Sequence, residues 1–156
     1  MKTQDNPGIL IPPPLIYAAF FGLAYLVKSI YPINVQILKS HNFHILGWVL
    51  ILITLAILLP GLWKFWRTKN TLVTIKPANS LQTKGIYAYT RNPMYLGLLL
   101  LYTALACFSG NCWTLIFLPV LFIIVQVYII RREEKYLDRA FAEEYKIYRK
   151  KVRRWI

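Results

Sequence analysis

Residues able to bind a charged ligand surround a proline that opens a long uncharged stretch. Arg91, Asn92 and Tyr95 flank Pro93, and the next charged residue is Arg131. Proline suits the first turn of a helix and keeps Asn92 out of helical backbone space, so the Asn92 amide can point away from the helix. The unpaired N–H groups and the dipole of a helix start favour an anion. We therefore expect this stretch to be able to hold a carboxylate.

A second charged stretch follows directly where the uncharged one ends. Arg131, Arg132, Glu133 and Glu134 are consecutive. A carboxylate binds an amine, and an arginine binds a carboxylate or a phosphate. An ordinary i,i+4 ion pair would account for one of the two glutamates.

Long uncharged stretches predict the elements that must position these residues. Hydrophobic residues make up 57% of the chain, above the ~45–50% usual for a soluble domain. A membrane span needs ~20 apolar residues. The prediction is one all-α membrane domain over residues 1–156, a polytopic helical bundle with four transmembrane helices and a C-terminal amphipathic helix over 133–154. The spans are expected at 14–33, 43–65, 94–109 and 113–131, the third of them short.

The basic residues predict the orientation in the membrane. The net charge is +13, and 16 of the 19 Lys and Arg residues lie within 64–91 and 131–154, which four crossings place on one side. The positive-inside rule puts this side, with both termini, in the cytoplasm, so the charge reflects topology and anionic lipid and not a nucleic-acid partner. Residues 12–14 are prolines, and no cleaved signal is expected.

The two charged stretches resemble one known family. Gly85 to Gly97 matches the G-x-Y-x-x-x-R-(H/N)-P-x-Y-x-G signature of the isoprenylcysteine carboxyl methyltransferase and phospholipid methyltransferase superfamily. Glu133 to Tyr148 resembles its E-E-x-x-L-x-x-x-F-G-x-E-Y-x-x-Y, with Ala142 in place of the Gly. The Asn92 variant is similar to bacterial-type relatives. The resemblance implies a methyltransferase of the membrane, with S-adenosyl-L-methionine as cofactor and a lipophilic or membrane-presented acceptor.

The resemblance also implies which residues serve the cofactor. The amino acid tail of S-adenosylmethionine offers an ammonium and a carboxylate, and its adenine needs apolar walls. Glu133 is the carboxylate preferred for the ammonium, with Glu134 as the alternative. Arg91 is expected to act on cofactor or substrate, and Arg131 or Arg132 to orient an anionic acceptor. The residues expected to line the cofactor are Asn79, Ser80, Leu81, Gln82, Gly85, Tyr87, Asn92, Pro93, Met94, Tyr95, Glu133, Glu134, Tyr145 and Tyr148, the last two by folding back as a lid.

Several alternatives stay open. The acceptor can be an isoprenylcysteine-type carboxylate, a phospholipid amine, or a small thiol or amine. A reductase on the same scaffold and a non-catalytic membrane scaffold protein are the other classes. Cys107 and Cys112 bracket the turn between the third and fourth spans, where a disulfide is possible, but no metal-ligand spacing is present. His41 and His44 fall on the far side and are expected to be surface residues.

Overall fold

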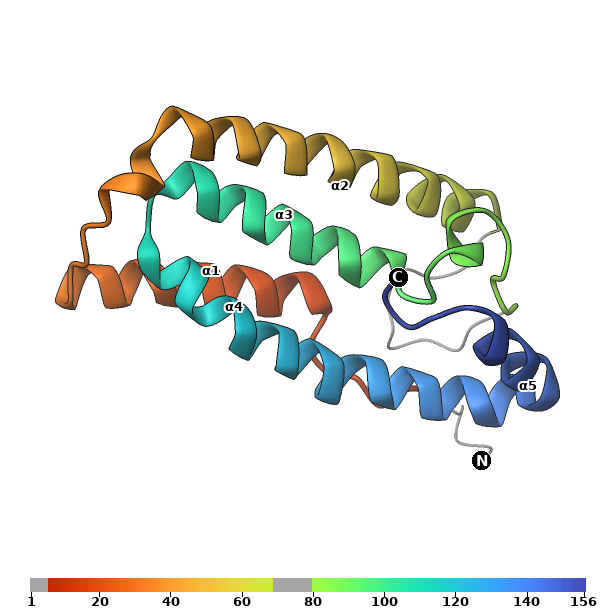
Figure 1. Ribbon diagram of the computed structural model, residues 1–156. Helices are drawn as coiled ribbons and strands as arrows, with labels where there is room; N and C mark the ends of the chain where they lie inside the picture. The colour runs from red at the N-terminus through yellow and green to blue at the C-terminus, as the bar shows by residue number, and fades with distance from the viewer. Residues whose placement is uncertain (1–5, 69–79) are drawn as a thin grey trace.

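The chain folds into a bundle of helices. The computed structural model describes residues 6–68 and 80–156, and every regular element in these ranges is helical. The elements are α1 (Pro13–Ile30), the 3₁₀ turn η1 (Gln36–Lys39), α2 (His41–Thr68), the 3₁₀ turn η2 (Gly85–Ala88), α3 (Pro93–Ser109), α4 (Cys112–Ile124), the π-helix η3 (Val125–Ile130) and α5 (Arg131–Lys151). Figure 1 shows α2 beside α3 and α1 beside α4. The predicted helical membrane bundle is confirmed.

Three of the helices are long and apolar enough to cross a membrane. They are α1, residues 41–63 of α2, and the continuous helix of α4, η3 and α5. The apolar part of the last ends at Ile130, where the charges begin. The remaining apolar helix, α3, has only 17 residues, or about 25 Å at 1.5 Å per residue, against a hydrocarbon core of about 30 Å. The prediction that the third crossing is short therefore agrees with its length.

Small residues let α2 and α3 approach closely. A β-carbon at Gly97 of α3 would collide with the Leu58 side chain of α2. At the other end of the pair, a β-carbon at Gly47 would lie 2.8 Å from the ring of Phe108. In lipid, helices associate through such close packing, because burial of apolar surface there brings no gain over contact with lipid tails. The two glycines therefore specify how α3 docks on α2.

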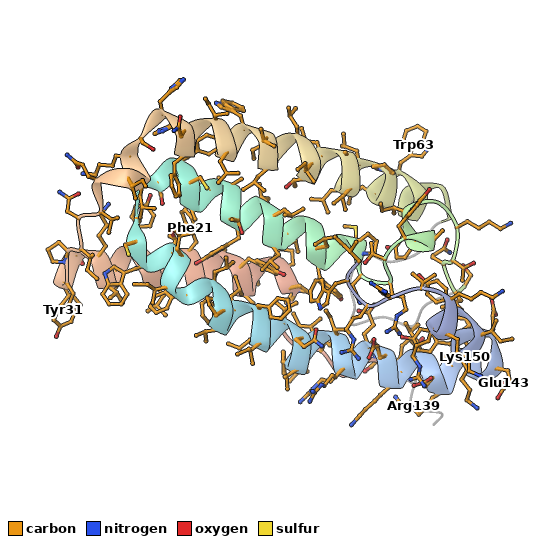
Figure 2. All side chains as sticks on the ribbon, viewed as in Figure 1. Phe21, Tyr31, Trp63, Arg139, Glu143 and Lys150 are labelled. Atoms are coloured by element: carbon orange, nitrogen blue, oxygen red, sulfur yellow. The ribbon has the colours of Figure 1, made fainter. Side chains whose placement is uncertain are left out.

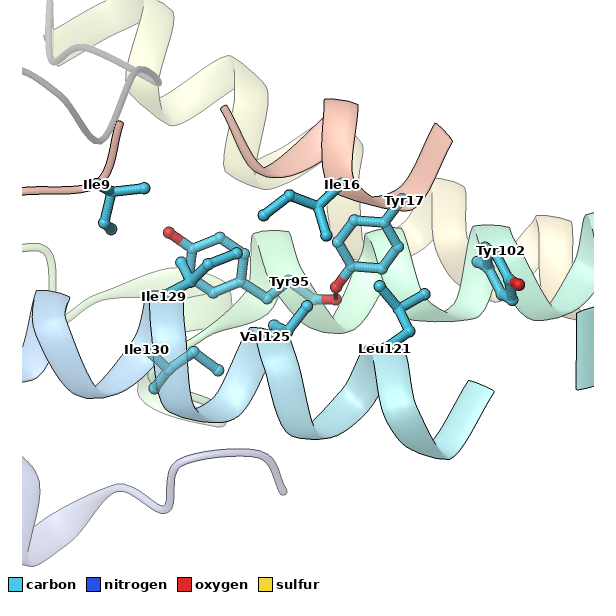
Figure 3. Packing of buried hydrophobic residues seen from close by; sticks show 9 residues of the cluster. All are labelled: Ile9, Ile16, Tyr17, Tyr95, Tyr102, Leu121, Val125, Ile129 and Ile130. Atoms are coloured by element: carbon cyan, nitrogen blue, oxygen red, sulfur yellow. Dashed lines mark hydrogen bonds between the residues drawn. The ribbon is translucent and has the colours of Figure 1, made fainter. Parts of the chain in front are cut away.

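The core lies between α1, α3 and the long C-terminal helix. Figure 3 shows Tyr95 of α3 between Ile9, which precedes α1, and Ile129 of η3. Tyr17 of α1 donates a hydrogen bond to the Tyr95 carbonyl oxygen (3.2 Å). This bond fixes α1 against the first turn of α3, which is where the site residues begin.

The structure refines one expectation and answers one open question. The C-terminal amphipathic helix is present as α5, but it breaks at Ala142 (φ 38°, ψ −112°) and ends at Lys151, before the expected residue 154. The break turns the second half of α5 back toward the start of α3 (Figure 1). The possible disulfide is not formed, since Cys107 and Cys112 are free thiols. Cys107 is buried in the bundle, where a thiol packs as a small apolar group.

Charge is concentrated at one end of the bundle. In Figure 2 the side chains of Arg139, Glu143 and Lys150 project around α5, while Tyr31 lies at the opposite end. His44, near the start of α2, bonds through Nδ1 with the Ser40 carbonyl oxygen (3.1 Å) at that opposite end. The α5 end therefore holds the charged residues of the candidate site.

Candidate functional site

The sequence at the start of α3 leaves the backbone N–H groups of its first turn without a side-chain cap. Pro93 is the first helical residue, and no side chain caps the helix. The first i→i−4 bond runs from the Leu96 amide to the Asn92 carbonyl oxygen (3.0 Å). The Asn92 side chain points away from the helix, as predicted, and its Nδ2 donates to the Arg154 carbonyl oxygen (2.8 Å). The amides of Met94 and Tyr95 precede that first bond and carry the positive end of the helix dipole.

Arg91 and Glu134 belong to one ion-pair network. The Arg91 Nη2 atom lies 3.2 Å from Glu134 Oε1, and Arg91 Nη1 donates to the Tyr145 hydroxyl (3.0 Å). Arg154 grips the same carboxylate with two bonds, from Nε (2.9 Å) and Nη2 (2.6 Å). Glu134 is thus neutralised by two guanidinium groups. The Arg91 Nε atom is buried and has no hydrogen-bond partner in the described part of the chain.

Glu133 has a different environment. Its Oε2 accepts a hydrogen bond from the Tyr95 hydroxyl (2.7 Å). Among the side chains that the structure describes, no lysine or arginine pairs with it. Burial raises the pKa of the Glu133 carboxyl, the nearby charge of Glu134 adds to the rise, and the Tyr95 hydrogen bond opposes it. The ionised carboxylate would therefore be stabilised by a cationic ligand.

The turn at Ala142 brings two tyrosines to the loop before α3. The Tyr148 hydroxyl donates to the Tyr87 carbonyl oxygen (2.6 Å), and Tyr145 stacks obliquely on Tyr148 with ring centroids 6.2 Å apart. Burial raises the pKa of Tyr145 to about 12, so this phenol stays neutral beside Arg91. Tyr87, Tyr145 and Tyr148 are all buried.

The other loop residues lie around this contact. Leu81 packs against the cluster of Tyr145 and Tyr148. Gln82 donates to the Ser80 hydroxyl (2.8 Å), and Gly85 starts η2 with φ 70°, a conformation that glycine adopts without strain. Met94 points toward α2, where its sulfur lies close to Gly61. Asn79 falls outside the described residues.

The structure does not join Arg131 and Arg132 to the network of Arg91 and Glu134. Both are exposed, and Arg132 donates to the Gly8 carbonyl oxygen (2.9 Å) and lies over the Tyr128 ring. Helical phase accounts for Arg132, which precedes Glu134 by two residues, or about 200° around a helix with 3.6 residues per turn. Arg132 therefore lies on the opposite face of α5 from Glu134.

The residues after α5 were absent from the predicted site. Arg154 contributes a guanidinium to Glu134, and its carbonyl oxygen also accepts from the Thr90 hydroxyl (3.3 Å). The Arg153 carbonyl oxygen accepts from the Arg91 amide (3.0 Å). Arg154 is twenty positions from Glu134 and more than sixty from Thr90, so no local spacing in the sequence indicates these contacts.

The fold and the site define an integral membrane protein of helical type in which Arg91, Glu134 and Arg154 form an ion-pair network at one end of the bundle. A family model described as phospholipid methyltransferase matches residues 42–144, which is more than half of the chain. The chain belongs to the phospholipid methyltransferase family. An uncharacterized protein of Haemophilus influenzae is 38% identical over 63 residues, which cover 40% of this chain and 100% of that protein. No solved structure matches the chain significantly.

The residues present fit the amino acid tail of S-adenosylmethionine, the usual methyl donor of methyltransferases. Such a tail ends in an ammonium and a carboxylate. Glu133 offers a carboxylate without a basic partner among the described side chains, and Arg91 Nε offers a buried N–H without an acceptor. Charge-assisted hydrogen bonds of both kinds would satisfy groups that are otherwise costly to bury.

Proposed function

We propose that the protein is an S-adenosylmethionine-dependent methyltransferase that acts on a lipophilic or membrane-presented acceptor. The observation that carries the proposal is the contrast between two adjacent carboxylates. Glu134 is neutralised by Arg91 and Arg154, whereas Glu133 is held, among the described side chains, by the Tyr95 hydroxyl alone. A partly buried carboxylate in this state is suited to bind the ammonium of an amino acid.

The chain's own residues supply binding and orientation. The cofactor carries an already activated methyl group, so the protein needs no covalent nucleophile. Glu133 binds the ammonium, and Arg91 Nε with the amides at the start of α3 binds the carboxylate. Tyr87, with Tyr145 and Tyr148 folded over it, keeps water from this side of the site. Holding donor and acceptor in line is then the main catalytic contribution.

The acceptor is proposed to arrive from the membrane. The site lies just beyond the apolar part of the long helix, so an acceptor anchored in lipid reaches it without leaving the bilayer. Arg131 and Arg132 are exposed at this level and are suited to an anionic headgroup. A phospholipid amine and an isoprenylcysteine-type carboxylate are both compatible with this route, as is a small thiol or amine.

The proposed location is a bacterial inner membrane, with the site and both termini on the cytoplasmic side. The support is the distribution of charge. Among the described residues, the basic residues of 80–91 and 131–154 belong to the end of the bundle that holds the site. The positive-inside rule assigns such an end to the cytoplasm, where S-adenosylmethionine is made. We propose that the whole chain forms one domain.

Calorimetry of S-adenosylmethionine binding to the purified protein in detergent tests the cofactor. We expect binding by the wild type and a loss of about ten-fold or more in affinity for Glu133→Gln, because a charge-assisted bond is removed. Glu144→Gln is the matched control: this carboxylate is exposed on α5 and should leave affinity unchanged. Absence of binding by the wild type would contradict the proposal.

A second measurement identifies the acceptor. Membrane lipids are incubated with the protein and methyl-labelled cofactor, and the products are separated by chromatography. Label in a phospholipid that has gained a methyl group on its amine supports the phospholipid acceptor. Label in a base-labile ester supports a carboxylate acceptor. Transfer of label to neither, by a protein that binds the cofactor, would overturn the membrane-presented acceptor.

A further inference from the structure

The segment Val152–Ile156 crosses the site after α5 ends. Figure 1 shows the chain running from α5 back to the start of α3, where the C label lies. Val152 is buried against Tyr145 and Tyr148. Trp155 donates from Nε1 to Gln126 Oε1 in η3 (2.9 Å), and its ring stacks on Phe122 with centroids 5.1 Å apart. The segment is therefore anchored on both sides of the site.

Its backbone satisfies the polar groups just before α3. The Arg153 carbonyl oxygen accepts from the Arg91 amide (3.0 Å). The Arg154 carbonyl oxygen accepts from both Asn92 Nδ2 (2.8 Å) and the Thr90 hydroxyl (3.3 Å). Three donors of residues 90–92 thus depend on two carbonyl groups of this segment. Without them these donors would be left unpaired in a buried place, or the loop would rearrange.

The partly buried side chain of Arg154 acts on the other half of the site. The Arg154 guanidinium binds both oxygens of Glu134, at 2.9 and 2.6 Å, and Glu134 in turn lies 3.2 Å from Arg91. A bidentate arginine fixes the plane of a carboxylate as well as its position. Arg154 therefore determines where Glu134 sits, and through it the direction of the Arg91 guanidinium.

We propose that the segment 152–156 is the positioning element of this site, and that Arg154 is its positioning residue. It ties the loop before α3 to the start of α5, so that Arg91 and Glu133 face the same ligand. Arg154 is not assigned a ligand contact and acts through Glu134. This inference rests on the proposed function, since the ligand whose binding it supports is the amino acid tail of S-adenosylmethionine.

Substitutions of Arg154 test the proposal by calorimetry with S-adenosylmethionine. Arg154→Gln should weaken binding about ten-fold or more, because the charged bidentate contact is lost. Arg154→Lys keeps the positive charge but not the two-pronged guanidinium contact, so it should bind more tightly than Arg154→Gln and less tightly than the wild type. Arg153→Gln is the matched control, because the Arg153 side chain is exposed and only its carbonyl oxygen is used. It should bind like the wild type.

A double substitution separates positioning from general stability. If Arg154 acts through Glu134, Glu134→Gln combined with Arg154→Gln should bind no more weakly than the worse single variant. Additive losses would overturn the proposal, as would wild-type affinity in Arg154→Gln. An equal loss in Arg153→Gln would overturn it too, because net charge alone would then explain the effect.

Hydrogen exchange without cofactor keeps this inference separate from the proposed function. In Arg154→Gln the amides of Arg91 and Asn92 should exchange about ten-fold faster or more, while those within α1 to α4 keep their protection. Unchanged exchange at both amides would overturn the positioning role. Failure of the wild type to bind S-adenosylmethionine would instead overturn the proposed function, whatever the exchange shows.

Discussion

At the scale of residues, the main feature of the site is that two neighbouring glutamates have different surroundings. Within residues 6–68 and 80–156, Glu134 pairs with two arginines and Glu133 accepts a hydrogen bond from one tyrosine. Neighbouring titratable groups whose environments differ in this way commonly take different roles. We assign Glu134 to the framework of the site and Glu133 to the ligand.

The Tyr95 hydrogen bond should set the pH dependence of cofactor binding. Glu133 binds an ammonium only when ionised, so affinity should rise as the pH rises through its raised pKa and fall below it. The bond from Tyr95 lowers that pKa. In Tyr95→Phe the pKa therefore rises further, and the midpoint of the affinity profile should move to higher pH. Calorimetry between pH 5 and 9 measures this midpoint.

Tyr102→Phe is the control for this prediction. Tyr102 is also a buried tyrosine of α3, but its hydroxyl donates to the Thr114 carbonyl oxygen (3.1 Å), away from the site. Its removal should leave the midpoint where it is. A midpoint that stays fixed in Tyr95→Phe would show that Glu133 is not the group that binds the ammonium.

At the scale of elements, one turn and one helix contact decide whether the site forms. The turn at Ala142 folds α5 back so that Tyr148 reaches the Tyr87 carbonyl oxygen. The contact of Gly97 with Leu58 seats α3 on α2. The turn places the second half of α5 against the loop before α3, and the helix contact places the start of α3 against α2.

Ala142→Gly should stabilise the protein. Ala142 has φ 38°, where a β-carbon is strained and glycine is not. We expect a gain of about 1 kcal/mol in the free energy of unfolding, measured by thermal or denaturant unfolding in detergent. Ala140→Gly, on the exposed helical part of α5, should instead lose about 1 kcal/mol. A loss of stability in both variants would show that the backbone at Ala142 is not strained.

Gly97→Ala should weaken the docking of α3 on α2. The added β-carbon meets the Leu58 side chain, and overpacking of this kind costs about 1–3 kcal/mol. Gly22→Ala on α1 is the control, since no atom lies near its β-carbon and the better helix former should be neutral or stabilising. Unfolding in detergent compares the two. Equal stability of Gly97→Ala and the wild type would contradict the close approach.

At the scale of the whole molecule, the charge distribution and the bundle give the same orientation. The loop before α3 and the whole of α5 lie at one end, and the turn around η1 lies at the other. Basic residues are concentrated at the first end. The two signature segments therefore lie at the same end of the bundle.

Thiol labelling of intact cells should reveal this orientation. In a background with Cys107→Ser and Cys112→Ser, Asn34→Cys lies on the turn before η1 and Lys151→Cys at the end of α5, both exposed. A membrane-impermeant reagent should label Asn34→Cys in intact cells and Lys151→Cys only after the membrane is opened. The reverse pattern would place the site outside the cytoplasm.

The sequence alone determined the helical bundle, the short third helix and the clustering of lysine and arginine in two segments. These depend on local composition: the length of an apolar run and the placement of lysine and arginine act within one segment. The Arg91-Asn92-Pro93 motif likewise predicted a helix start with an outward amide, because proline restricts its immediate neighbours. The structure confirmed the helical bundle, the short α3 and the outward Asn92 amide.

Only the tertiary structure decided which of the charged residues work together. Glu133 and Glu134 are adjacent in sequence, but the phase of α5 turns one toward Tyr95 and the other toward Arg91. Arg154 joins the site through contacts with residues far away in sequence, after a turn at Ala142 that local helical periodicity argued against. Contacts of this kind depend on which residues lie close together in space, and the packing of the whole bundle determines that.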